Sequence, residues 1–212
     1  INSGIIMTIN PILVVILSYF MLKEVVGARK ITGILLGAIG AILLTLTAGT
    51  GKGDSVLGDL FLFINAFSYA IYLVITKPLM TKYSPLTVIT WTFTFGTLYI
   101  LIFPPTLIEV VESNFANIPS DVWAKILYVI IGVTFLTYLL TIYGLKYLTP
   151  SISSSYIYLQ PVMVMFFAVV LVWLGLAEDY TSTITTKKIL YMFIIFLGVY
   201  MAGSSSNKFM KA

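Results

Sequence analysis

The chain has 212 residues, of which 59% are hydrophobic and only 9% are charged, and its formal net charge is +4. A soluble domain carries about 25% charged residues, so this composition excludes a water-soluble globular protein and predicts a protein surrounded by lipid. The sequence contains no Cys and no His, which excludes disulfides and thiolate metal sites and removes the commonest general base. We therefore expect neither a cofactor nor a metal.

Stretches without a charged residue follow one another along the chain, each near or above the length of a membrane helix. A helix needs about 20 apolar residues to cross a hydrocarbon core about 30 Å thick. Lipid allows only helices or closed barrels, and apolar runs such as residues 193–197 lack the alternation of barrel strands. The sequence therefore predicts an all-α, polytopic transmembrane helical bundle with seven visible spans, at residues 1–22, 31–51, 60–76, 83–108, 126–145, 147–177 and 189–207.

Loop charges predict which side of the membrane each loop faces, because positively charged loops stay in the cytoplasm. One side collects eight of the twelve basic residues, namely Lys23, Arg29, Lys30, Lys77, Lys82, Lys146, Lys208 and Lys211. The C-terminus is therefore expected in the cytoplasm of a multi-pass protein of the cell (inner or plasma) membrane. The connection at residues 108–122 is then external, with room for a short surface helix.

Two parts of the chain share an order of features that predicts an internal repeat. Small polar residues open both, an amide–proline pair interrupts both at the same distance, and a glutamate and then a basic pair follow. The matching features are Asn10-Pro11 with Gln160-Pro161, which are 150 residues apart, and Glu24 with Glu178. In the second copy the glutamate lies farther from the proline, and Trp173-Leu174 stands where the spacing from Pro11 to Glu24 would place it.

The number of spans in each repeat predicts its orientation. Three spans precede the matched pair in the second repeat, so residues 57–206 form a five-helix domain. An odd number of spans gives the two repeats opposite orientations in the membrane, and the predicted sides of the equivalent loops agree. If the first repeat is built alike, residues 1–50 are its last two helices, and three helices of about ninety residues precede them.

The same residues resemble the EamA domain of the drug/metabolite transporter superfamily. Motifs that resemble the end of one such domain are Asn10-Pro11, Leu22-Lys23-Glu24, and Gly33, Gly37 and Gly40. Motifs that resemble a whole domain are Gly58-Asp59-Leu60, Ser68-Tyr69-Ala70, Lys77 and Gln160-Pro161-Val162. The resemblance implies ten helices in two inverted five-helix repeats, of which this chain holds the last seven.

Proline and polar residues inside the spans mark the candidate site. Pro11 and Pro161, each preceded by an amide, should break helical hydrogen bonding, either as a packing kink or beside a substrate path. Polar stripes at helical spacing favour a solute cavity, with hydrogen bonding between helices as the alternative. The candidate substrate-binding residues are Asn65, Ser68, Tyr69, Tyr72, Trp91, Tyr138, Ser153, Tyr156 and Gln160, and the helix-break residues are Asn10, Pro11 and Pro161.

Other patterns indicate structural roles. Gly33, Gly37 and Ala41 repeat every four residues, which is the spacing of a small-residue stripe for close helix contact. Glu24 lies near Lys23, Arg29 and Lys30, so we expect a cytoplasmic salt bridge or helix cap rather than a proton carrier.

These observations predict a secondary membrane transporter, a permease for efflux of small organic metabolites such as amino acids, working by alternating access between the inverted repeats. The alternative is a non-transporting membrane scaffold or sensor. An enzyme is not expected: residues 51–54 match the GxGD string of intramembrane aspartyl proteases, but no second buried aspartate exists to form a dyad. The expected partners are a small-molecule solute and the lipid bilayer, with no nucleic acid, and a homodimer is consistent with the sequence.

Overall fold

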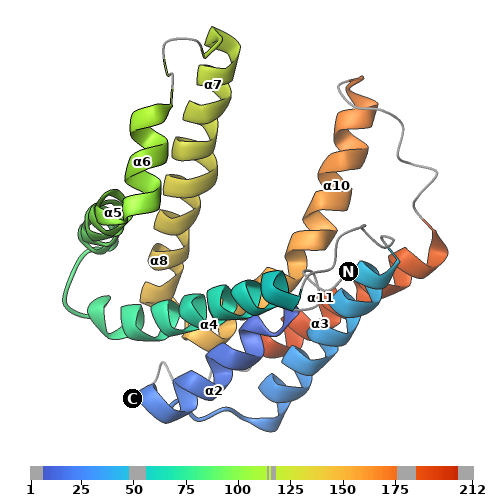
Figure 1. Ribbon diagram of the computed structural model, residues 1–212. Helices are drawn as coiled ribbons and strands as arrows, with labels where there is room; N and C mark the ends of the chain where they lie inside the picture. The colour runs from blue at the N-terminus through green and yellow to red at the C-terminus, as the bar shows by residue number, and fades with distance from the viewer. Residues whose placement is uncertain (1–6, 48–55, 114, 116–117, 176–184, 205–212) are drawn as a thin grey trace. The chain divides into compact units, whose positions relative to one another are not determined.

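The structure is a computed structural model that describes residues 7–47, 56–113, 115, 118–175 and 185–204, and all regular elements in these residues are helices (Figure 1). The shorter apolar helix α2 spans Asn10–Leu22. Six helices are long and apolar enough to cross a membrane: Ala28–Leu46, Leu57–Leu79, Pro85–Ile102, Ser120–Tyr147, Pro150–Trp173 and Thr186–Ser204. The prediction of an all-α polytopic membrane bundle is therefore confirmed. The predicted repeat partner Glu178, the string at 51–54 and the C-terminus lie outside the described residues.

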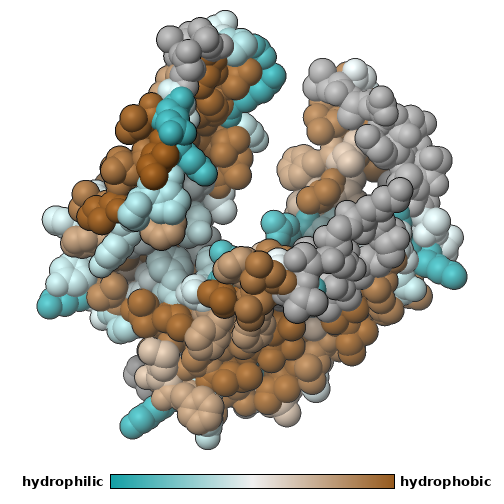
Figure 2. Space-filling model, viewed as in Figure 1, coloured by the Kyte–Doolittle hydropathy of each residue, from teal (hydrophilic) through white to brown (hydrophobic). Residues whose placement is uncertain are grey.

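Large apolar side chains on the outside of the helices explain why the chain needs lipid. Phe20 is 73% exposed, Tyr99 is 77% exposed and Trp173 is 84% exposed. Figure 2 shows apolar residues spread over much of the visible face. Exposing apolar surface to water costs about 25 cal/mol of free energy per Å². This surface is therefore suited to a hydrocarbon environment.

Packing divides the chain into two compact units. The terminal unit joins Ile1–Ile75 with Leu148–Ala212. It holds α2, α3 (Ala28–Leu46), most of α4 (Val56–Leu79), α9 (Pro150–Ser155), the 3-10 helix η3 (Tyr156–Leu159), α10 (Gln160–Trp173) and α11 (Thr186–Ser204). The central unit, Thr76–Tyr147, holds α5 (Pro85–Ile102), α6 (Pro104–Glu112), α7 (Ser120–Tyr128), the π-helix η2 (Val129–Leu136) and α8 (Thr137–Tyr147).

Helix boundaries in the central unit differ from the prediction, and the span expected at residues 126–145 already begins at Ser120. The span expected at residues 83–108 ends at Ile102, and Phe103 is extended with φ −70° and ψ 114°. A residue before proline avoids the helical backbone, and Pro104 then opens α6, none of whose residues is buried. The short helix expected within residues 108–122 therefore begins earlier, at Pro104.

Close contact between α3 and α11 organises the terminal unit (Figure 1). A Cβ added at Gly33 would lie 2.5 Å from the backbone nitrogen of Ala202, and one added at Gly198 would meet the backbone nitrogen of Gly37. The predicted small-residue stripe is thus confirmed as a helix contact. Gly40 extends it, because a Cβ there would lie 2.8 Å from Cγ1 of Ile195.

A buried ion pair ties the connection between α2 and α3 to the start of α9. Lys30 Nζ lies 2.8 Å from Glu24 Oε1, and the two side chains are 5% and 10% exposed. Ser151 Oγ donates to Glu24 Oε2 at 2.9 Å, and Lys30 Nζ donates to Thr149 Oγ1 at 3.4 Å. The salt bridge predicted for Glu24 is confirmed, and its partner is Lys30.

Gly198→Ala should destabilise the protein by about 1–3 kcal/mol, because a methyl group there overpacks against the backbone of α3. Gly96→Ala is the matched control, since nothing lies within 4 Å of a Cβ added at Gly96. The stability of both variants is measured by unfolding the purified proteins in detergent, once with heat and once with denaturant. Equal stability of the two would contradict close backbone packing at Gly198.

Glu24→Gln should cost about 3–5 kcal/mol of stability, because it leaves the buried ammonium of Lys30 without its counter-charge. The double variant Glu24→Gln/Lys30→Met should recover much of that loss, since neither charge remains. Asp121→Asn tests an exposed pair, whose side chains are 65–74% exposed, and should change stability by about 1 kcal/mol or less. Additive losses from Glu24→Gln and Lys30→Met in a double-mutant cycle would show that the two residues do not interact.

Candidate functional site

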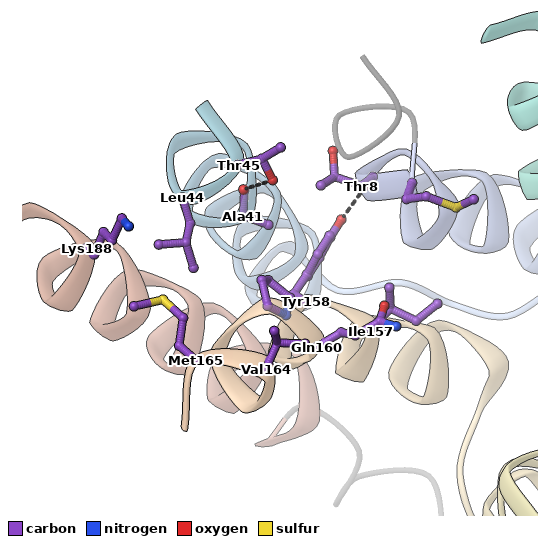
Figure 3. A pocket seen from close by; sticks show the side chains of 12 residues that line it. Thr8, Ala41, Leu44, Thr45, Ile157, Tyr158, Gln160, Val164, Met165 and Lys188 are labelled. Atoms are coloured by element: carbon purple, nitrogen blue, oxygen red, sulfur yellow. Dashed lines mark hydrogen bonds between the residues drawn. The ribbon is translucent and has the colours of Figure 1, made fainter. Parts of the chain in front are cut away.

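The terminal unit contains a cavity of about 450 Å³, a size typical of small-molecule sites. It lies between α3, η3, the start of α10, α11 and the residues just before α2 (Figure 3). Its lining residues are Met7, Thr8, Ala41, Leu44, Thr45, Ile157, Tyr158, Gln160, Pro161, Val164, Met165 and Lys188. Most of this lining is apolar, so the few polar groups determine what can bind.

An interrupted helix forms one wall of the cavity. The α-helical hydrogen bonding of α9 ends at Ser155, η3 continues as a 3-10 helix, and α10 starts at Gln160 with Pro161 in its first turn. Proline suits a first turn because it has no N–H to leave unpaired. The break therefore places Gln160 and Pro161 together at the cavity.

Tyr158 is the buried polar side chain of this wall that lines the cavity. It is 1% exposed, and its hydroxyl donates to the carbonyl oxygen of Thr8 at 3.1 Å. A Cβ added at Gly37 would lie 2.5 Å from Cδ2 of its ring, so the ring occupies the space that this glycine leaves open. Tyr158 thus joins η3 to α3 and to Thr8, just before α2.

The interrupted helix changes which side chains share a face. Helical spacing predicted that Ser153, Tyr156 and Gln160 lie together, but η3 turns at a 3-10 period. Tyr156 is 48% exposed and does not line the cavity, Ser153 is half-buried on α9, and Gln160 lines the cavity. Tyr158 was absent from the predicted site, and nothing in the spacing marked it, because the change of period is not visible in the sequence.

The other predicted residues are not among those that line this cavity. On α4, Asn65 and Ser68 are exposed, and the half-buried rings of Tyr69 and Tyr72 lie 6.1 Å apart between centroids. In the central unit, Trp91 and Tyr138 contact aromatic neighbours. Trp91 stacks on Phe95 with 5.6 Å between the ring centroids, and Tyr138 meets Phe93 edge-on with 5.6 Å between the ring centroids.

A groove of about 500 Å³ in the central unit offers less to a polar solute. It is lined by Thr90, Phe93, Thr94, Thr97, Leu98 and Phe135. The hydroxyls of Thr90 and Thr94 donate at 2.8 Å to carbonyl oxygens one turn earlier on α5. Because these donors are engaged within their own helix, we place the candidate site in the terminal unit.

The predicted helix-break residues Asn10 and Pro11 lie on a buried face of α2. Ile9 precedes α2 in a turn, and Pro11 occupies the first turn of that helix. Asn10 is 4% exposed, and its Oδ1 has no hydrogen-bond partner among the described residues, as is also true of Ser18 Oγ on the same face. Buried polar atoms without a partner are rare, which sets this face of α2 apart from an ordinary packing surface.

Residues 56–204 match the EamA-like transporter family. The chain is 30% identical over 169 residues to "Uncharacterized transporter YyaM" of Bacillus subtilis (strain 168), covering 78% of this chain and 54% of that protein. It is 28% identical over 166 residues to "Uncharacterized transporter YetK" of the same organism, covering 76% of this chain and 49% of that protein. The chain spans about half the length of these curated relatives.

A solved structure titled "Crystal structure of protein" shares the fold, with a TM-score of 0.72 and 19% identity over all of this chain and 69% of that one. The all-helical architecture, the apolar helices and the family match agree with one another. The apolar helices make this chain a multi-pass membrane protein. Because the family match covers more than half of the chain, the chain belongs to the EamA-like transporter family, within the drug/metabolite transporter superfamily.

Proposed function

We propose that this chain is part of a secondary transporter that exports small organic metabolites such as amino acids. The observation that carries the proposal is the cavity beside the interrupted helix α9–η3–α10. In transporters, discontinuous helices supply the binding site, because unwound backbone and the side chains next to it can meet a solute at membrane depth.

Alternating access between two inverted repeats is the proposed mechanism. In this proposal residues 1–50 belong to one repeat, residues 57–206 form the other, and the C-terminus is cytoplasmic. Pro11 and Pro161 support it, because each stands in the first turn of a helix that follows a break in α-helix, at the turn residue Ile9 in one case and at η3 in the other. The two helices therefore share a local design at positions 150 residues apart.

Gln160 is the side chain that we assign to the solute first. Its amide lines the cavity and makes no hydrogen bond to the described residues, so it can both donate to and accept from a solute. The α4 stripe and the aromatic pairs of the central unit are proposed as further parts of the solute path: Asn65, Ser68, Tyr69, Tyr72, Trp91 and Tyr138. Ser153, Tyr156, Asn10 and the two prolines complete the proposed set.

Gln160→Leu keeps the size of the side chain and removes its amide. Efflux of radiolabelled amino acids from proteoliposomes that contain the complete protein should fall about tenfold, the loss expected from one neutral hydrogen bond. Thr141→Val is the control, because its exposed hydroxyl only donates to the carbonyl oxygen of Thr137. Absence of amino-acid flux with the wild-type protein would reject the proposed solute class, and absence of flux for any small metabolite would favour a scaffold.

A further inference from the structure

Among the residues that the structure describes, one charged side chain lines the cavity, and it is a cation. Lys188 lies in the first turn of α11 and is half-buried, whereas its neighbour Lys187 is exposed and does not line the cavity. Figure 3 shows Lys188 on the side of the cavity near Leu44 and Met165, with Thr8 at the opposite side. Among the described residues that form the lining there is no carboxylate.

Three other lysines among the described residues have polar partners within the protein. Lys30 pairs with Glu24, Lys125 pairs with Asp121, and Lys77 donates to the carbonyl oxygen of Leu145 at 2.6 Å. Lys188 has no ion-pair partner in the part of the chain that the structure describes. Its place in a first helical turn does not stabilise α11 either, because the positive end of the helix dipole lies there. The contacts of the described residues therefore give no structural reason for a lysine at this position.

The remaining polar groups of the lining are largely engaged within the protein. The hydroxyl of Thr45 donates to the carbonyl oxygen of Ala41 at 2.8 Å, and that of Tyr158 donates to Thr8. This leaves the ammonium of Lys188 and the amide of Gln160 to meet a solute. Both groups can donate to a carboxylate, and a hydrogen bond between charged groups is about twice as strong as a neutral one.

We propose that this cavity selects amphipathic organic anions, with a carboxylate held by Lys188 and an apolar body packed against Leu44, Val164 and Met165. The proposal rests on the proposed transporter function and names the class of its solute. Amino acids satisfy it through their carboxylate, and their amine is dispensable. A cationic amine without a carboxylate is excluded, because it would enter a mostly apolar cavity in which the ammonium of Lys188 repels it.

Three probes of nearly equal shape separate these groups: L-leucine, 4-methylpentanoate, which lacks the amine, and 3-methylbutylamine, which lacks the carboxylate. Each is added to the purified complete protein, and its binding is measured from the rise in melting temperature over a concentration series. The expected result is binding of leucine and 4-methylpentanoate and no binding of 3-methylbutylamine. Tighter binding of the amine, or no binding of either carboxylate, would overturn the proposal.

Lys188→Met should weaken binding of 4-methylpentanoate about tenfold to a hundredfold, as expected for loss of a charged hydrogen bond. Lys188→Arg should retain most of it, because the charge remains. Lys187→Met is the matched control: it removes the same charge from the same turn, outside the cavity, and should bind as the wild type does. Unchanged carboxylate binding by Lys188→Met, or an equal loss in Lys187→Met, would overturn the role of Lys188.

Flux measurements separate failure of this proposal from failure of the transporter proposal. In proteoliposomes, amine flux that is insensitive to Lys188→Met would leave transport standing and reject anion selection. Carboxylate binding that depends on Lys188, without movement of any probe across the membrane, would retain the site and reject transport.

Discussion

Helices surrounded by hydrocarbon gain little from covering apolar side chains, so the terminal unit depends on the close backbone approach of α3 and α11. Glycine makes that approach feasible: added Cβ atoms at Gly33 and Gly198 would meet backbone atoms of the opposite helix. The absence of a side chain at Gly37 also leaves room for the ring of Tyr158. The same short stripe therefore sets the helix contact and seats the residue that holds the interrupted helix.

The candidate site follows from that arrangement. Tyr158 fixes η3 between α3 and Thr8, and α10 restarts at Gln160 beside the cavity. At the start of α9, the buried pair of Glu24 and Lys30 holds Ser151. The interrupted segment is thus attached before its break, where Ser151 donates to the carboxylate of Glu24, and within the break, where the ring and hydroxyl of Tyr158 are held. Such rigid support suits a binding site, because it fixes polar groups before the solute arrives.

The sequence predicted the membrane helices well, because apolar length is a direct consequence of bilayer thickness. It missed the helix break at Phe103, although the following prolines signal one, because hydropathy alone does not register backbone geometry. It placed Tyr156 rather than Tyr158 in the candidate site, since helical spacing was assumed across a segment that turns at a 3-10 period. Lys188 was not among the predicted site residues, because only the packing of α3, α10 and α11 brings it to the cavity.

The central claim is that the cavity beside Gln160 is the solute site of an alternating-access carrier. These 212 residues contain no Cys, so Gln160→Cys introduces a unique thiol into them, and any Cys elsewhere in the complete protein is replaced by Ser. The reaction of the new thiol at position 160 with a membrane-impermeant maleimide is measured from each side of sealed vesicles, with and without 4-methylpentanoate. The account predicts labelling from both sides and a slower rate when the carboxylate is present. Labelling from one side only, at a rate that the solute does not change, would contradict it.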